Sequence, residues 1–216
     1  TLRFTTTYGK NDSRFFNQLN NMIPKLITLG VETILKIICE KIIIKNIQIV
    51  DRNNKSNGPI DELYINAENI IFNKINISNV RINIRDLVLK FALIKKKFFI
   101  DNCCAIIHLK LSRDNINKTL LNKKWESLKS SIESFTLMSF QGIEINNKSI
   151  NFIPSDVLSK KKCNYILQYD KNSISLVNNI NGKKLSIFND KNIIVKSVFL
   201  YESYIELELS SRIIFN

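Results

Sequence analysis

The spacing of the apolar residues changes at Ser112. From Cys103 to Leu111 the side chains alternate between an apolar face and a mixed one, which is the period of a β-strand. After Ser112 the apolar residues Ile116 and Leu120 are one helical turn apart. The pattern therefore predicts a strand that leads directly into a helix. Ser112 is expected to cap this helix, and Asp114 in its first turn interacts favourably with the helix dipole.

Two further helices are predicted. Asp12 or Ser13 begins one helical pattern, and Pro24 either kinks this helix or starts the next one. From Pro24 to Cys39 only a narrow strip is polar, so this helix is expected to be surrounded by other elements. A second amphipathic helix is expected from Asn122 to Phe140, with Trp125, Leu128, Ile132 and Phe135 on its apolar face.

In the remaining segments apolar and polar residues alternate every second position, and short turns separate the segments, as is typical of antiparallel strands. Three precede the change of period: Lys41–Val50, Ile60–Phe72 and Lys74–Leu93. Seven follow the amphipathic helix: one near Ile143, then Ser149–Ile153, Asn164–Asp170, Ser173–Val177, Lys183–Phe188, Ile193–Leu200 and Tyr204–Ile214. Within Lys74–Leu93 the apolar phase shifts between Ile77 and Val80, which predicts a β-bulge.

These elements predict the fold class. We expect an α+β protein in which a long, curved, bulged antiparallel sheet wraps the apolar N-terminal helix, with the second amphipathic helix in the middle of the chain. Residues 1–216 are expected to form a single domain, with residues 1–12 as a loose arm. With 44% hydrophobic residues among 216, the chain can bury a substantial core.

The net charge of +13 is weaker evidence for an anionic partner than its size suggests. Most of the excess is Lys, in a chain also rich in Ile and Asn, and all three residue types have A- and T-rich codons. Arg, the usual reader of phosphates and bases, is sparse. We interpret the charge mainly as a solvated lysine surface. Two local runs, Lys95–Lys97 and Lys160–Lys162, are the candidates for contact with an anionic surface.

No motif in the sequence predicts catalysis. His108 is the single histidine, and no carboxylate lies near it in sequence, so a general base there needs a partner from elsewhere. The acidic residues Asp61-Glu62, Glu202, Glu206 and Glu208 have the pattern of solvated strand edges. Four cysteines without CxxC spacing indicate neither a disulfide scaffold nor a zinc site. We expect no enzyme activity, metal or cofactor.

The aliphatic content of helices and strands together leaves two possibilities. Tight packing gives an ordinary core, whereas a sheet that stays open along one side gives an apolar groove of a size that suits acyl chains. The candidate groove residues lie on the two predicted helices and one strand: Leu26, Ile27, Ile34, Ile82, Trp125, Leu128, Ile132 and Phe135.

One run resembles a family signature. Leu111–Leu120, LSRDNINKTL, is similar to the LTxxDLN-type signature of the LmeA-like phospholipid-binding family of cyanobacteria and actinobacteria, with Leu111, Ser112, Asp114, Ile116 and Asn117 matching in order. The segment Val80–Lys97, with its Asp86-Leu87 pair, resembles the strand that precedes the signature. Ser112 replaces the common Thr, and the expected glycine-rich turns are mostly Asn and Lys.

The resemblance covers Met22 to Phe215 and implies a curved β structure around a helix, similar to the tubular lipid-binding proteins, with a lipid-accessible apolar cavity. The bias towards Ile, Lys and Asn is consistent with a cyanobacterial member of this family from an A- and T-rich genome. Ser112, Asp114 and Asn117 form the structural part of the motif, and no residue is carried over as a ligand contact.

The expected function is therefore non-enzymatic binding or transfer of phospholipid or acyl chains at an anionic membrane surface, with Lys95, Lys96 and Lys97 docking on that surface. Two alternatives remain: a basic binding module for nucleic acid or an acidic partner, and a lipid-modifying enzyme with an unrecognised site. Thr1–Ser13 has no apolar signal-peptide core. The expected location is cytoplasmic or peripheral to a membrane, or periplasmic if a signal peptide has been removed.

Overall fold

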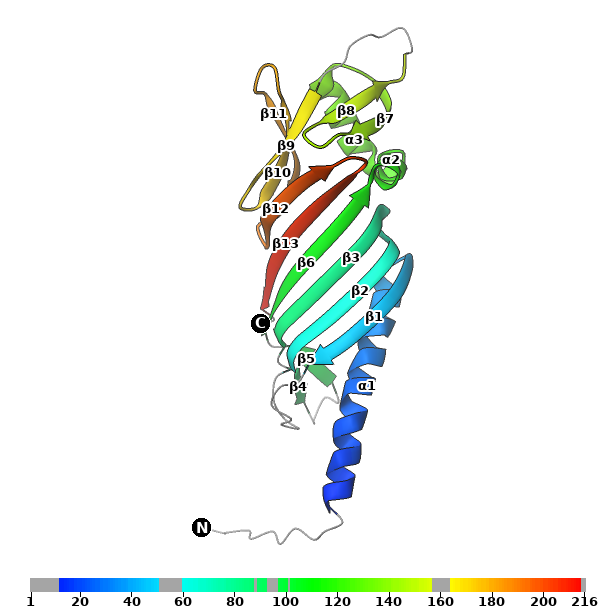
Figure 1. The fold of residues 1–216 in the computed structure, drawn as a ribbon, viewed down its shortest axis with the longest axis vertical. Helices are drawn as coiled ribbons and strands as arrows, with labels where there is room; N and C mark the ends of the chain where they lie inside the picture. The colour runs from blue at the N-terminus through cyan, green and yellow to red at the C-terminus, as the bar shows by residue number, and fades with distance from the viewer. Residues whose placement is uncertain are drawn as a thin grey trace.

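The computed structural model describes residues 12–50, 60–87, 89–92, 97–100, 102–156 and 164–214. Within these residues the fold has two antiparallel sheets, a separate two-stranded ribbon and three α-helices, and the larger sheet curls strongly (Figure 1). The predicted α+β class, with a long, curved, bulged sheet, an N-terminal helix and a helix in mid-chain, is confirmed.

The larger sheet has six strands, in the order β1 (Lys41–Val50), β2 (Ile60–Phe72), β3 (Ile75–Leu87), β6 (Asn102–Ser112), β13 (Tyr204–Ile214) and β12 (Ile193–Tyr201). The smaller sheet has the order β11 (Lys184–Asn189), β10 (Ser173–Asn178), β9 (Asn164–Asp170), β8 (Ile150–Pro154) and β7 (Phe140–Ile145). A ribbon of β4 (Leu89–Ala92) and β5 (Lys97–Ile100) is separate. The helices are α1 (Asp12–Ile38), α2 (Arg113–Leu120), the short 3₁₀ turn η1 (Lys123–Trp125) and α3 (Glu126–Thr136).

The predicted joint at Ser112 is confirmed. Strand β6 ends at Ser112 and α2 begins at the next residue. The Ser112 hydroxyl accepts a hydrogen bond from the Asn115 backbone N–H at 3.2 Å, and its own N–H donates to the Ser78 hydroxyl at 3.0 Å. One serine thus caps α2 while the other ties its start to β3.

The bulge predicted in β3 is wrong, although the shift of apolar phase is present. Strands β2 and β3 pair without a register shift, with Ala67 opposite Val80 and Ile70 opposite Ile77. In both strands the alternation of apolar residues shifts by one position at the same place, where Asn69 adopts a left-handed backbone with φ of 52°. Because the two changes match, pairing is not interrupted. The register shifts of this sheet lie in its edge pairs, β1–β2 and β12–β13.

Helix α1 is one continuous helix that contains Pro24, and it is covered on one side. Val31 and Leu35 pack on the buried cluster that includes Leu63 and Cys103. The opposite side carries large exposed side chains: Leu26, Leu29, Ile34, Ile37 and Ile38. The expectation that this helix is surrounded is therefore wrong, because the sheet contacts it along one side and leaves the other uncovered. Its N-terminal part extends past the end of the sheet (Figure 1).

Helix α3 is shorter than expected. It ends at Thr136, and Leu137 follows in a left-handed conformation with φ of 52°. Phe140, predicted as the end of the helix, instead begins β7 and is 1% exposed. An apolar residue at position 140 fits both the helical and the strand spacing of apolar residues, so the sequence pattern alone does not assign it. Burial in the smaller sheet places Phe140 in a strand.

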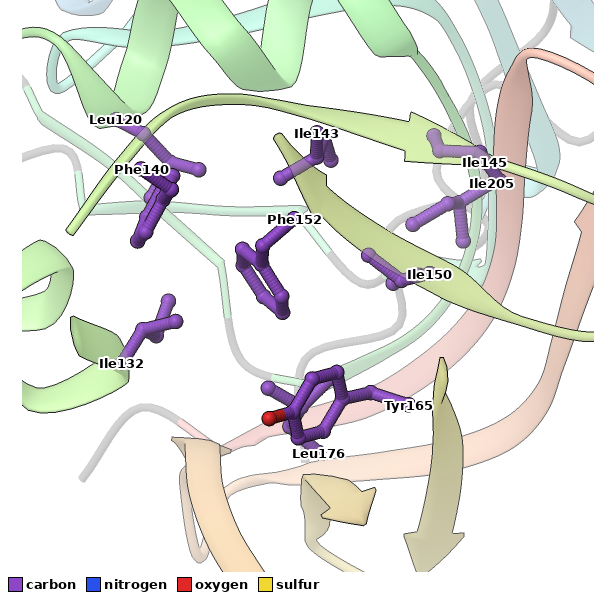
Figure 2. Close-up of a cluster of buried hydrophobic side chains, with 10 residues drawn as sticks. All are labelled: Leu120, Ile132, Phe140, Ile143, Ile145, Ile150, Phe152, Tyr165, Leu176 and Ile205. Carbon is purple, nitrogen blue, oxygen red and sulfur yellow. The ribbon is translucent and has the colours of Figure 1, made fainter. Parts of the chain in front are cut away.

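The core between the smaller sheet and the helices α2 and α3 is closed by aromatic rings. Phe140 and Phe152 lie 4.8 Å apart between ring centroids, and Phe152 and Tyr165 lie 5.3 Å apart, both edge to face. Ile132 and Leu176 close the same cluster, in which the side chains point toward one another (Figure 2). Ile205 of β13 also belongs to it, so the two sheets share this core.

Candidate functional site

The six-stranded sheet has one face that is almost entirely apolar, here called the inner face. Its residues form rows that cross five neighbouring strands without a polar member. One row is Ile65, Ile82, Ile107, Leu209 and Val195, and the next is Ala67, Val80, Leu109, Leu207 and Val198. At about 4.8 Å between strands, each row is roughly 19 Å wide.

The inner face is covered at its two ends and less completely between them. At one end α1 packs on it through Val31 and Leu35, and at the other end Ile174 of β10 packs on Val195 and Leu209. Between them Ile82, Ile107 and Leu109 stay partly exposed, whereas Leu63 and Ile65 are buried. An aliphatic surface that a folded chain leaves partly exposed between two covered ends can accept an apolar ligand.

The predicted groove residues separate into four places: the inner face, the closed aromatic core, η1 and helix α1. Ile82 lies in the middle of the inner face, in the same cluster as Val31 and Leu35 of α1. Leu128, Ile132 and Phe135 belong to the closed aromatic core, and Ile132 is 5% exposed. The α3 positions thus fill an ordinary core rather than a groove.

Trp125 lies apart from both clusters. Its indole N–H donates to the Asn73 carbonyl at 3.3 Å, so it anchors η1 to the turn between β2 and β3.

The α1 candidates also differ from one another. Leu26 and Ile34 are on the uncovered side of the helix, with 61% and 58% of their surface exposed, and Ile27 is partly buried. Leu26 and Ile34 consequently do not line the inner face. The residues of α1 that do contact it, Val31 and Leu35, follow Ile27 at intervals of four and could have been selected by that spacing.

The lysine runs proposed for docking cannot be placed. Lys95 and Lys96, and the second run Lys160–Lys162, lie outside the described residues, and Lys97 is the first residue of β5.

The three motif residues have structural contacts. Asn117 links α2 to the smaller sheet: its side-chain oxygen accepts from the Ile143 N–H at 2.8 Å, and its amide packs against Gly142. Ser112 caps α2, and Asp114 is exposed beside the Arg113 guanidinium, at 3.2 Å. Asp114 and Asn117 therefore lie on the helix that joins the two sheets, away from the middle of the inner face.

The outer face of the large sheet carries the charged residues. Neighbouring strands place Arg81, His108, Glu208 and Ser197 in one row, so Glu208 supplies the carboxylate that is missing near His108 in the sequence. The glutamate stands between His108 and Ser197, which are two strand spacings, roughly 10 Å, apart. A nucleophilic triad needs the imidazole next to the hydroxyl, and this row does not provide that order.

A concavity of about 230 Å³ lies over the same row and includes Lys110, Glu206 and Phe199. It opens on the far side of the sheet from the inner face, so it cannot hold an acyl chain that rests on Ile82 and Ile107. Because its lining alternates positive and negative side chains, it also differs from the continuous basic surface that follows a phosphate backbone.

The inner face also includes a cysteine. Cys103 is 3% exposed, and burial raises the pKa of its thiol, so it stays neutral and behaves as a small apolar residue. Its neighbour Cys104 lies on the outer face, opposite Arg85 and Arg212, as the alternation predicted.

Sequence reasoning missed Ile107 and Leu109 as candidate site residues, although it assigned both to the apolar face of their strand. Their importance comes from the strands beside them, because β6 lies between β3 and β13. Leu207 and Leu209 come about 100 residues later in the chain, and no local pattern indicates that they continue the same rows.

Among the described residues, none of the helices has both the length and the apolar composition of a membrane span. No group of three or more His, Cys, Asp or Glu side chains in that part of the chain is placed to hold a metal ion. Comparison with known proteins gives no match to a family model, a curated protein or a solved structure.

Proposed function

We propose that this protein binds the acyl chains of phospholipids, or of related lipids, on the inner face of its six-stranded sheet, without catalysis and at an anionic membrane surface. The observation that carries the proposal is the pair of unbroken apolar rows, whose central residues Ile82, Ile107 and Leu109 remain partly exposed. The resemblance of Leu111–Leu120 to the LmeA-like signature supports the same ligand class.

The energetics favour a chain-like ligand. Each methylene group removed from water contributes about 0.8 kcal/mol, so a chain of roughly fourteen carbons gains on the order of 10 kcal/mol before the cost of ordering it is subtracted. The inner face presents aliphatic side chains and no row of hydrogen-bonding groups, so it would recognise chain length and bulk. Any preference for one lipid headgroup over another would have to come from polar residues at the edges of the inner face.

The outer face offers less support for the alternative functions. Its arginine and lysine residues alternate with glutamates, as in the Lys45–Glu68 ion pair of 3.1 Å and the Arg85–Glu62 pair of 3.8 Å. Such mixed rows are typical of a solvated sheet surface.

Two neighbouring isoleucines on one strand test the proposal. Ile107 lies on the inner face and Ile106 on the outer face, and both are partly buried. We expect Ile107→Asn to reduce uptake of a fluorescent fatty acid by tenfold or more, because a polar side chain then stands in the middle of an apolar row. Ile106→Asn is the matched control and should bind as the unchanged protein does.

Melting temperatures of both variants show whether the fold is intact. If Ile107→Asn melts near the control and still binds the fatty acid normally, the inner face is not the binding surface. If neither the unchanged protein nor the control takes up the probe, the inner face is only a loosely covered core.

A further inference from the structure

The uncovered side of α1 is the most unusual apolar surface among the described residues. Leu26, Leu29, Ile34, Ile37 and Ile38 expose 61%, 61%, 58%, 76% and 51% of their surface. Gly30 lies in the middle of this group, and a Cβ atom built on it would have nothing within 4 Å. Soluble proteins rarely place several large aliphatic side chains together in water.

These side chains form a broad stripe rather than a narrow seam. At 100° per residue, the five positions extend over about 180° of the helix circumference. Leu26, Gly30, Ile34 and Ile37 form its centre, and the sequence continues the same spacing of three and four towards the N-terminus of α1 at Leu19 and Ile23. By the same count Val31 and Leu35, which pack on the sheet, lie about 110° and 150° from the centre of the stripe, beyond its edge at Ile38.

We propose that this stripe inserts into the interface of an anionic phospholipid membrane and holds the protein there with the helix in the membrane plane. This inference rests on the proposed function and adds the element that would bring the inner face to its lipid. An amphipathic helix in this position buries its apolar side at the boundary between headgroups and acyl chains.

The charges around the stripe fit an anionic surface. Lys25 is exposed at the edge of the stripe next to Leu29, where a long side chain can reach the headgroups while its stem stays apolar. Lys36 lies on the same edge and pairs with Glu32 at 2.6 Å. Lys41, at the start of the adjacent edge strand, is also exposed. The net charge of +13 gives the whole molecule the complementary sign.

A second copy of the chain fits the stripe less well. Five side chains at these exposures present roughly 500 Å², so pairing two copies would bury about 1,000 Å², below the roughly 1,200 Å² of stable interfaces. A rigid partner also covers one side of a helix, whereas Leu29 and Ile38 point to opposite edges of the stripe. A fluid acyl layer can surround all five.

The test compares two triple variants of the full chain. The stripe variant carries Leu26→Gln, Ile34→Gln and Ile37→Gln. The control carries Leu137→Gln, Ile180→Gln and Phe199→Gln, which replace side chains of similar exposure, at 79%, 81% and 56%, outside α1. Both sets are exposed, so both variants should melt close to the unchanged protein. If the stripe variant fails to fold, Ile37→Gln alone takes its place.

Each protein is mixed with vesicles of equal parts phosphatidylcholine and phosphatidylglycerol, and the floating fraction is measured at low and high salt. We expect the stripe variant to associate about 100-fold more weakly and the control to associate normally. The difference in vesicle association between the stripe variant and the control should persist at high salt, since the lost interaction is apolar. Fatty-acid uptake by the stripe variant should stay unchanged, which separates this inference from the inner-face proposal.

Equal flotation of the stripe variant and the control would overturn the inference. So would a failure of the unchanged protein to float, or a dimer in solution that the stripe variant converts to monomer, because the stripe would then be an interface between copies.

Discussion

At the scale of single residues, a few polar side chains hold the joint between the two sheets. Thr119 donates to the Asn115 carbonyl at 2.8 Å and accepts from the Asn76 N–H at 3.0 Å, so α2 is tied to β3. Asn117 makes the corresponding link to β7. The Ser112 cap could be predicted because its partner is three residues away. The partner of Asn117 is 26 residues away, and nothing in the sequence pairs the two.

This difference leads to a prediction for Asn117. Asn117→Ala leaves the Ile143 N–H without its acceptor in a partly buried site, so the free energy of unfolding should fall by about 1–3 kcal/mol. Asp114→Ala is the control on the same helix, and its exposed side chain should contribute about 0.5 kcal/mol or less. Urea unfolding measures both. Equal losses would mean that the Asn117 link contributes no more than a surface ion pair.

At the scale of elements, periodicity identified the strands well and the environment of the helices poorly. The limits of β9 and β13 were predicted without error, and in the structure a turn follows β9 and another precedes β13. The apolar content of α1 indicated burial on all sides, yet among its described side chains Val31 and Leu35 are the ones that pack on the buried cluster of the sheet. Composition reports how apolar a helix is and does not report whether the surrounding partner is protein or lipid.

The two sides of α1 should therefore respond differently to truncation. Leu35→Ala removes methyl groups from a packed cluster and should destabilise the protein by about 2 kcal/mol or more. Ile37→Ala, on a side chain that is 76% exposed, should change the unfolding free energy by less than about 0.5 kcal/mol. Thermal unfolding in detergent-free buffer compares them. A large loss for Ile37→Ala would show that the exposed side is packed in solution.

At the scale of the whole molecule, strand order creates the candidate site. The chain places β6 between β3 and β13, and so combines residues from Leu63 to Leu209 into one apolar face. Alternation within each strand was visible in the sequence, and the curl was expected from long, bulged strands. Which strands would be neighbours was not predictable, because pairing between distant segments leaves no local signal.

The charge of the molecule supplies a prediction that does not depend on the inner face. Changing Lys95, Lys96 and Lys97 to Gln should weaken association with anionic vesicles, since each lysine near such a surface contributes about 1 kcal/mol. The loss should be greatest at low salt and disappear at high salt, unlike the loss predicted for α1. Flotation across a salt series measures it. Unchanged association at low salt would move the docking surface elsewhere, with Lys160–Lys162 as the next candidates.

Acyl chains held on the inner face can be detected by native mass spectrometry of gently purified protein, because a bound lipid adds its own mass to the 25.1 kDa chain. We expect adducts with the masses of phospholipids or fatty acids, and we expect these adducts to be lost in Ile107→Asn but not in Ile106→Asn. A protein that carries no lipid when purified, and takes up none from vesicles, would contradict the proposal that the inner face holds acyl chains.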